Sequence, residues 1–337
     1  MKSFVSLLFL MGAFSTGLYA QDTGNVLKGD LKVHDPVMIK QKGTYYIFST
    51  GKGVPIKTSK DKITWQNSGN VFASPLTWFK QDIPNQDGAL WAPDIHYRNG
   101  QFHLYYSVSG WMNFNSSIGY ATNATLDQSS PLYKWIDHGQ IISYKNGGEK
   151  VNVIDPNIVV EKNGTVWMLY GSYQGGLRLV ELDAKTGKLK SDKPELTTIT
   201  TSLGEGSYII RGAGYYYIFA SRGICCKGIQ SNYQVVMGRS KNIRGPYLTK
   251  KGESWVNNKY TLFLEGNYAE PGRGHNGFFT EKDTTFIVYH AYTRSAGGTS
   301  MLNIKPVYVD ADGWPTINVT KKLFKLNGDK KAQVIGK

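Results

Sequence analysis

Residues 94–107, DIHYRNGQFHLYYS, have the pattern of two β-strands joined by a tight turn. The polar Asp94 opens a run rich in branched and aromatic side chains, Asn99-Gly100 interrupts it, and a second such run follows. Asn-Gly between apolar runs is typical of a β-hairpin, because both turn residues must adopt positive φ. We therefore predict a hairpin here, with Asp94 at the start of its first strand.

The same pattern recurs about every sixty positions along the chain. Each copy opens on a polar residue and continues through a hairpin and a third strand-like run, and several copies end on an aromatic residue. No stretch sustains a helical spacing of apolar residues, so we expect about four strands in each unit. Such a repeat indicates an all-β fold, a five-bladed β-propeller. The opening residues are Asp35, Asp94, Asp155, Glu205 and His275, the expected third strands are 55–58, 117–121, 177–180, 234–238 and 301–304, and the closing aromatics are Trp65, Trp135, Tyr247 and Trp314.

The opening residues are where chemistry is expected. The first strand of a propeller blade lines the central channel, so residues that open these strands would ring one mouth of the channel. Asp35, Asp155 and Glu205 are the carboxylates that interest us most. Inverting hydrolysis of a glycosidic bond needs a general base and a general acid about 6.5–9.5 Å apart. Carboxylates on different blades can meet that separation, and a neighbouring carboxylate raises the pKa of the acid.

The N-terminus has the features of a secretory signal. Lys2 gives a positive start, residues 3–18 are mostly apolar or small, and cleavage after Ala20 would leave Gln21 first. A buried helix or a membrane anchor is the alternative, but the apolar run is short for a membrane span. We expect a signal peptide at 1–20 and a single propeller domain at 21–337. Export to the periplasm or out of the cell follows, with no membrane span after cleavage.

The charge of the chain raises the question of nucleic-acid binding. The formal net charge is +14 at pH 7 and the pI is near 9.4. The Lys and Arg residues are scattered, however, without a basic block or a known nucleic-acid motif. Scattered charge indicates a solvated basic surface, so we expect no nucleic-acid partner.

The two cysteines, Cys225 and Cys226, are adjacent in the chain. They cannot form a long-range disulfide framework, and two ligands at one place are too few for a metal site without distant partners. They could form a strained vicinal disulfide or stay as two small thiols. Reduced or structural thiols are the expectation.

Several short motifs occur in order along nearly the whole mature chain. Each is weak alone, but together they make the chain resemble glycoside hydrolase family 43, and most closely its endo-α-1,5-L-arabinanase members. The motifs are His34-Asp35-Pro36, Trp91-Ala92-Pro93-Asp94, Ser116-Ser117-Ile118-Gly119, Asp155-Pro156-Asn157, Gly204-Glu205-Gly206, Cys225-Cys226-Lys227-Gly228, Gly238-Arg239-Ser240 and Gly272-Arg273-Gly274-His275-Asn276-Gly277.

The resemblance implies a five-bladed propeller that hydrolyses linear arabinan by single displacement with inversion. It implies that Asp35 is the general base and Glu205 the general acid, with Asp155 orienting the acid and adjusting its pKa. It also implies a calcium ion on the channel axis, held mainly through water beside His275. Calcium prefers oxygen ligands, so a single histidine is consistent with an ion that is mostly hydrated. The alternative for His275 is a buried histidine whose hydrogen bonds are made within the protein and which binds no ion. The three catalytic carboxylates of the family are matched without Asp94, which we interpret as structural or as supporting the residues that contact substrate.

Aromatic and polar side chains near these motifs are candidate sugar contacts. Trp91 and Phe114 suit sugar platforms, because an aromatic face packs on the apolar C–H face of a sugar. Core packing is the alternative for Trp91. His34, Asn157 and Arg222 complete the candidate substrate contacts.

Other functions compete with an endo-acting, monomeric arabinanase. An exo-arabinanase, an α-L-arabinofuranosidase or a β-xylosidase would keep the fold and the mechanism. A non-catalytic carbohydrate-binding propeller would keep affinity for sugar without turnover. An interaction propeller of the tryptophan-aspartate repeat type would need shorter repeats and Trp-Asp pairs at the blade ends, which this sequence lacks.

Overall fold

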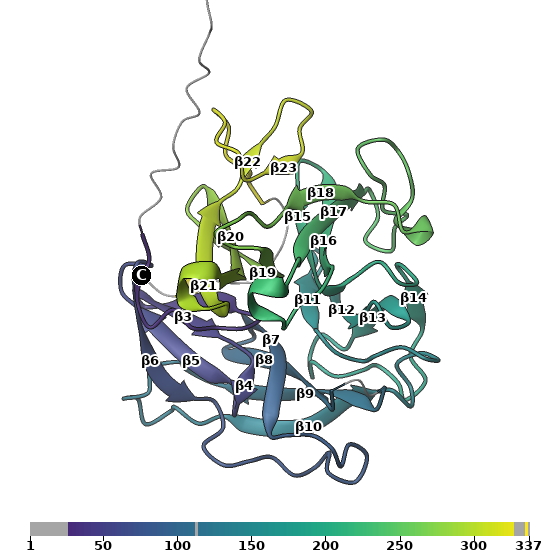
Figure 1. Ribbon diagram of the computed structural model, residues 1–337. Coiled ribbons are helices and arrows are strands. Elements are labelled where there is room, and N and C mark those ends of the chain that lie inside the picture. The colour runs from purple at the N-terminus through teal and green to yellow at the C-terminus, as the bar shows by residue number, and fades with distance from the viewer. Residues whose placement is uncertain (1–25, 112–113, 327–333, 336–337) are drawn as a thin grey trace, which may run out of the picture.

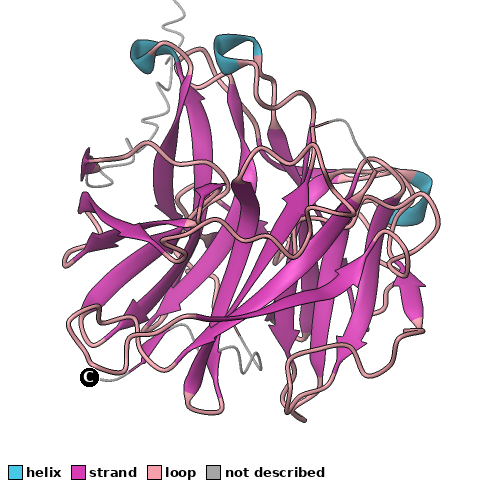
Figure 2. Ribbon diagram, turned by 90° about the horizontal axis from the view of Figure 1, so that it is seen from below, coloured by secondary structure: helices cyan, strands magenta, loops and turns pink. Residues whose placement is uncertain are grey.

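The computed structural model describes residues 26–111, 114–326 and 334–335. The predicted signal peptide at 1–20 lies outside these residues. Within them, five main sheets, the blades, surround a central axis. The blade near the end of the chain, in yellow-green, lies beside the blade near its start, in purple (Figure 1). Strands dominate the molecule in the side view as well (Figure 2). The predicted all-β, five-bladed propeller is confirmed.

Each blade is built from strands that follow one another in sequence and pair antiparallel. Blade 1 contains β2 (Val37–Gln41), β3 (Thr44–Phe48), β5 (Pro55–Ser59) and β6 (Thr64–Asn70), with β1 (Lys28–Gly29) parallel to β6. Blade 2 contains β7 (Ala89–Arg98), β8 (Gln101–Ser109), β9 (Ser116–Asn123) and β10 (Ile136–Ser143). Blade 3 contains β11 (Asn157–Val160), β12 (Val166–Ser172), β13 (Gly176–Leu182) and β14 (Leu196–Thr198). Blade 4 contains β15 (Glu205–Gly212), β16 (Tyr215–Arg222), β17 (Gln234–Ser240) and β18 (Thr261–Leu264).

Blade 5 has three strands of its own and takes the start of the chain as its outer edge. Its strands are β19 (Gly272–Glu281), β20 (Thr284–Thr293) and β21 (Thr299–Pro306). The N–H of Val33 donates to Ser300 O at 3.1 Å, and the N–H of Leu302 donates to Leu31 O at 2.8 Å. The first described residues therefore close the ring on the last blade.

The remaining short elements connect or cover the blades. Trp314, expected to end the last unit, instead lies between β22 (Tyr308–Val309) and β23 (Pro315–Thr316), which form a separate small sheet. The other pieces are β4 (Gly51–Lys52), β24 (Val334–Ile335) and the 3₁₀ turns η1 (Gly228–Gln230), η2 (Trp255–Asn257) and η3 (Arg294–Ala296). Among the described residues, no helix has the length and apolar character needed to cross a membrane.

The hydrophobic core is divided among the interfaces between neighbouring blades. Ile39 and Phe48 of blade 1 pack with Ile95 and Leu104 of blade 2, and an equivalent apolar cluster lies at each of the other four interfaces. Alternate residues of a strand point to opposite faces of its sheet. Each blade therefore buries both of its faces, one against each neighbouring blade. A blade can bury both faces only when the ring is closed.

One backbone feature repeats at the inner strand of every blade. A residue with positive φ stands there, and its N–H donates to a side chain of the preceding blade. The φ values are 51° at Asp35, 43° at Ala92, 59° at Asp155, 55° at Gly206 and 49° at His275. The bonds are Asp35 to His290 Nδ1 (3.1 Å), Ala92 to Thr50 Oγ1 (2.8 Å), Asp155 to Ser107 Oγ (2.8 Å), Gly206 to Asp155 Oδ2 (2.9 Å) and His275 to Ser221 Oγ (2.7 Å).

Blade 3 differs from the others in the acceptor it offers. Thr50, Ser107, Ser221 and His290 hold one equivalent position, which the strand registers assign to Gly171 in blade 3. A Cβ atom on Gly171 would lie 2.2 Å from Gly176 O, so no side chain fits there. The carboxylate of Asp155 accepts the N–H of Gly206 instead.

The repeat predicted from the sequence has the right period but the wrong register in two blades. Asp35, Asp155 and His275 are the positive-φ residues of their blades, whereas Asp94 comes two positions after Ala92 and Glu205 one position before Gly206. Because of its offset of two residues, Asp94 lies within β7, buried and paired with Tyr105 of β8, and not at the mouth of the channel. An offset of one places Glu205 at the position that His34 holds in blade 1.

We expect Ser107→Ala to destabilise the protein, because the buried N–H of Asp155 loses its acceptor. A buried group left unpaired costs about 1–3 kcal/mol in the free energy of unfolding, measurable by urea titration. Ser117→Ala is the matched control: Ser117 is also buried, but it donates within blade 2 to the exposed Gln140 (3.1 Å), which water can satisfy. Equal losses in the two variants would contradict a special role for the bond between blades.

Candidate active site

A cavity of about 330 Å³ lies where the inner strands begin, and side chains from all five blades line it. Asp35, Asp155 and Glu205 bring carboxylates from three blades, and His275 and Trp91 come from the remaining two. Four of the five predicted opening residues therefore converge. Asp94, the fifth, is not among the lining residues.

Asp35 is fixed by hydrogen bonds on both carboxylate oxygens. Its Oδ2 accepts from Thr50 Oγ1 at 2.5 Å and lies 2.8 Å from His34 Nδ1. Its Oδ1 lies 3.0 Å from His275 Nδ1. These contacts fix the orientation of the buried carboxylate. They also place two imidazoles beside its negative charge.

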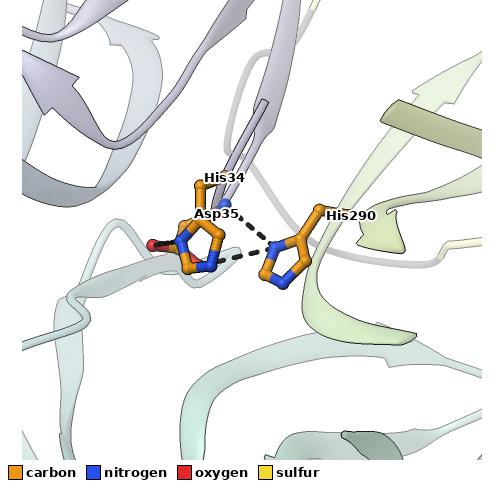
Figure 3. A group of neighbouring side chains, drawn as sticks. All are labelled: His34, Asp35 and His290. Carbon is orange, nitrogen blue, oxygen red and sulfur yellow. Dashed lines mark hydrogen bonds and ion pairs between the residues drawn. The ribbon is translucent and has the colours of Figure 1, made fainter. Parts of the chain in front are cut away.

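His290 of blade 5 also contacts Asp35 (Figure 3). Its ring stacks on that of His34 with 4.1 Å between centroids, and its Nδ1 accepts the N–H of Asp35. Donor atoms of His34, Asp35 and His290 lie within 4.8 Å of one another, as in a metal site. Because Nδ1 of His290 and Nδ1 of His34 are already bonded to Asp35, the geometry is that of a hydrogen-bonded cluster that holds the carboxylate.

The electrostatic environment keeps Asp35 ionised. Burial alone would raise the pKa of this carboxyl, but His275 and His34 beside it hold the pKa well below its usual range. Burial lowers the pKa of His275, yet the charges of Asp35 and Asp155 outweigh it and raise the pKa to about 9. Asp35 is therefore a carboxylate paired with an imidazolium at neutral pH, which is the state a general base requires.

Glu205 and Asp155 have the opposite environment. Burial, followed by the charge of Asp155, raises the pKa of Glu205 to about 7. Burial and the charge of Asp35 raise the pKa of Asp155 to about 6, although His275 opposes them. Tyr233 donates to Glu205 Oε1 at 2.9 Å, which orients the carboxyl. Glu205 can thus hold a proton near neutral pH, as a general acid must.

The glycine next to Glu205 is required by the packing of the site. Gly206 has a φ of 55°, and a Cβ atom there would lie 2.8 Å from His275 Nδ1. Its N–H bonds the Asp155 carboxylate. The absent side chain therefore lets His275, Asp155 and the backbone of Glu205 approach one another.

The surroundings of His275 also bear on the expected calcium ion. Asn276 and Ser207 follow His275 and Gly206 in the chain, and their buried side-chain polar atoms find no hydrogen-bond partner within the described residues. Buried polar atoms without a partner are where an unseen water or ion is expected. Apart from the carboxylates, these residues offer a cation only one hydroxyl and one amide oxygen, so they fit a hydrated cation better than a fully coordinated one.

Two aromatic residues form an apolar wall of the cavity. Trp91 is half-buried, and Trp111 beside it is 67% exposed, with 6.5 Å between ring centroids. Tyr173, 51% exposed, lines the cavity from blade 3. Trp91 and His34, two of the predicted substrate contacts, therefore line the cavity, and exposed aromatic side chains in the same lining are available to pack on sugar rings.

Three predicted substrate contacts do not line the cavity. Asn157 is buried and accepts the N–H of Ile209 through Oδ1 at 2.9 Å, so it joins blade 3 to blade 4. The guanidinium of Arg222 lies over the ring of Tyr260, 4.4 Å from its centroid. Phe114 is exposed and does not line the cavity. These three positions give no support to the expected contacts with substrate. The bond between blades explains the presence of Asn157 in β11.

Asp94 joins two blades in the same manner. Its Oδ2 accepts the N–H of Ile158 at 2.6 Å and the side-chain amide of Asn157 at 3.3 Å. The structural interpretation of Asp94 agrees with these contacts.

Sequence reasoning missed several residues of the cavity. Tyr233, Trp111 and Tyr173 carried no motif, since the chain holds 22 Tyr and 8 Trp residues and pattern alone does not single these out. Cys225 and Cys226 were recognised as an adjacent pair and as part of a motif but not as residues of the site, and both line the cavity. Only the closure of the ring brings these loops to the carboxylates.

Comparisons with known proteins agree with this geometry. Residues 26–315 match the model for glycosyl hydrolases family 43. The chain is 39% identical to the extracellular exo-α-(1→5)-L-arabinofuranosidase ArbA of Cellvibrio japonicus (strain Ueda107), over 85% of this chain and 86% of that protein. It is 33% identical to the extracellular endo-α-(1→5)-L-arabinanase 1 of Bacillus subtilis (strain 168), over 84% and 87%. Among solved structures, the Cellvibrio cellulosa α-L-arabinanase complexed with arabinohexaose superimposes with a TM-score of 0.81, at 38% identity over 85% of this chain and 95% of that one.

We expect Asp155→Asn to lower the pKa of Glu205, because it removes a neighbouring negative charge while an amide oxygen still accepts the N–H of Gly206. Carboxyl ¹³C NMR titration, with Glu205→Gln to assign the resonance, measures the change. Asp94→Asn alters a buried carboxylate outside the cavity and should leave that pKa in place. A Glu205 pKa that stays near 7 in Asp155→Asn would refute the coupling.

We expect Tyr233→Phe to move the same pKa in the opposite direction. The phenol donates to the Glu205 carboxylate and so stabilises its charged form; without it the pKa rises. Tyr217→Phe is the control, since this buried phenol donates to Gly313 O. An unchanged or lower pKa in Tyr233→Phe would show that the bond does not act on the acid.

Proposed function

The chain belongs to glycosyl hydrolases family 43, and from that premise we propose that it cleaves internal α-1,5-L-arabinofuranosidic bonds of linear arabinan with inversion. The observation that carries the proposal is the contrast between two carboxyls of one cavity, the buried Asp35 and the half-buried Glu205. The pKa of Asp35 is held low by two imidazoles, and the pKa of Glu205 is raised to about 7. Base and acid are thereby available at the same pH.

In this mechanism the two carboxyls act on opposite sides of the scissile bond. Asp35 accepts a proton from a water molecule, which attacks the anomeric carbon. Glu205 donates its proton to the departing glycosidic oxygen, and Tyr233 keeps that carboxyl oriented. Asp155 raises the proton affinity of Glu205 and, by holding the N–H of Gly206, fixes the backbone on which the acid stands.

We propose an open substrate groove, in which arabinan extends past the carboxyls in both directions. The exposed Trp111 and Tyr173 support it, since aromatic side chains near the cavity can hold sugar units beyond the scissile bond. The exo mode is the second candidate, because the relative at 39% identity is named as an exo-acting arabinofuranosidase.

Product profiling on debranched linear arabinan separates these modes, with an aryl arabinofuranoside and xylan run in parallel. A spread of arabino-oligosaccharides in the first per cent of reaction is the endo result. One product length from the start would replace endo by exo action. Hydrolysis of xylan without arabinan would overturn the substrate assignment.

We expect Asp35→Asn and Glu205→Gln each to reduce turnover of linear arabinan by about 10²- to 10⁴-fold, the range for loss of a positioned base or acid. Both changes are nearly isosteric, so the circular dichroism spectrum should stay the same. Asp183→Asn serves as control, because this half-buried carboxylate lies outside the cavity and accepts the N–H groups of Lys185 and Thr186 in a turn. Near-full turnover in either cavity variant would remove that residue from the mechanism.

We also propose a mainly hydrated calcium ion beside His275; when bound, it would supply positive charge next to the carboxylates. Calorimetric titration of chelator-treated protein with Ca²⁺ should show one site, and the ion should raise the midpoint of thermal unfolding. Mg²⁺ is the control, since it demands a smaller octahedral site. No heat and no thermal shift with Ca²⁺ would reject the ion and leave His275 as a half-buried imidazolium paired with Asp35.

A further inference from the structure

The two adjacent thiols face the carboxylate cavity, and no step of the hydrolysis uses them. Cys226 is exposed and Cys225 is half-buried, and both line the cavity beside Asp35 and Glu205. Their Sγ atoms are 2.8 Å apart, against about 2.05 Å in a disulfide. A small displacement would therefore join them.

The backbone on both sides of the pair is held by hydrogen bonds. The N–H of Cys226 donates to Tyr292 Oη at 2.8 Å, that of Ile224 to Asn232 Oδ1 at 2.6 Å, and that of Lys227 to Ser231 Oγ at 3.0 Å. Cys226 itself has a φ of 63°, a conformation that a side-chain-bearing residue keeps only when its surroundings impose it. The loop thus holds two thiols in contact at the mouth of the site.

The surroundings activate Cys226 as a nucleophile. The hydrogen bond with Cys225 and then His34, whose Nε2 is 3.8 Å from Sγ, outweigh burial and lower the pKa of Cys226 to about 5. When Nε2 of His34 is protonated it donates to Tyr292 Oη (2.8 Å), which leaves the phenol proton for Cys226 Sγ (3.7 Å). A thiolate at the cavity surface is the reactive form of cysteine.

We propose that Cys225 and Cys226 are a redox-modification site: they close to a vicinal disulfide by exchange with a disulfide donor, and the S–S face then forms part of the sugar-binding wall. The Cys226 thiolate attacks one sulfur of the donor, forming a mixed disulfide and releasing one donor thiolate. Cys225 then gives its proton to solvent and attacks Cys226 Sγ, expelling the second donor thiolate. The two cysteines are oxidised by the loss of two hydrogens, and the donor is reduced to two thiols.

Closure changes what the substrate meets in the cavity. An ionised thiol near carboxylates is replaced by a neutral, polarizable and apolar surface, on which the C–H face of a sugar can pack. A packing contact of this kind is worth a factor of roughly 2 to 10 in affinity, by analogy with paired rings. The oxidised enzyme should therefore have the lower KM on linear arabinan, with a smaller change in kcat; this part rests on the proposed function.

The test uses the full chain, reduced with dithiothreitol and then exposed to oxidised glutathione. Intact mass and thiol titration should show the loss of two hydrogens and of both free thiols, reversed by dithiothreitol. Cys225→Ser is the matched control, because Cys226 alone can only retain a glutathione adduct. A wild-type chain that keeps its thiols, keeps the adduct or crosslinks to a second chain would overturn ring closure.

Kinetics on linear arabinan then test the role of the ring. A KM that falls by roughly 2- to 10-fold on oxidation and returns on reduction supports the sugar-binding wall. An unchanged or higher KM overturns it. The mass measurement needs no substrate, so a failure of the proposed arabinan activity would be recognised separately from a failure of the disulfide.

Discussion

The hydrogen bond between blades, from the N–H of a positive-φ residue to a side chain of the preceding blade, is the interaction on which both the ring and the site depend. It occurs at all five junctions, including the one where Asp35 bonds His290 and closes the circle. A positive φ turns the N–H out of its own sheet, and the same turn directs the residue's side chain toward the axis. One backbone device thus joins the blades and delivers Asp35, Asp155 and His275 to one cavity.

At the junction between blades 3 and 4, the bond between blades also places a carboxylate in the site. Because Gly171 leaves the acceptor position empty, the carboxylate of Asp155 takes the bond and is buried beside Glu205. Burial raises the pKa of both carboxyls, the charge of Asp155 raises that of Glu205 further, and the charge of Asp35 raises that of Asp155. Asp35, in the same cavity, is instead stabilised in its charged form by His275 and His34. Acid and base are thus separated by their environments rather than by residue type.

The sequence was sufficient for the fold, because hairpin turns are local signals and the sixty-residue period repeats them along the whole chain. It was also sufficient to select Asp35, Asp155, Glu205 and His275 as residues of one site. It was insufficient for register: Asp94 and Glu205 seemed equivalent to the others but stand two positions after and one position before the positive-φ residue. Ala92 gives no residue-type sign of a positive φ, and Gly206, although glycine is typical of a positive φ, stands close to a second glycine, Gly204, from which the sequence does not distinguish it. Tyr233 and Trp111 could not be singled out either, since their role arises from contacts between loops far apart in the chain. Asn157 was read as a groove residue because of its motif, yet its amide joins two blades.

The central claim is that Asp35 activates water while Glu205 protonates the leaving oxygen, with no covalent intermediate. The most direct measurement is ¹H NMR of the anomeric protons during the first turnovers on an α-1,5-linked arabino-oligosaccharide, before the product mutarotates. The account predicts that the new reducing end appears first as the β-anomer, the inverted configuration. Initial release of the α-anomer would mean double displacement through a carboxylate nucleophile, and would contradict the roles assigned to Asp35 and Glu205.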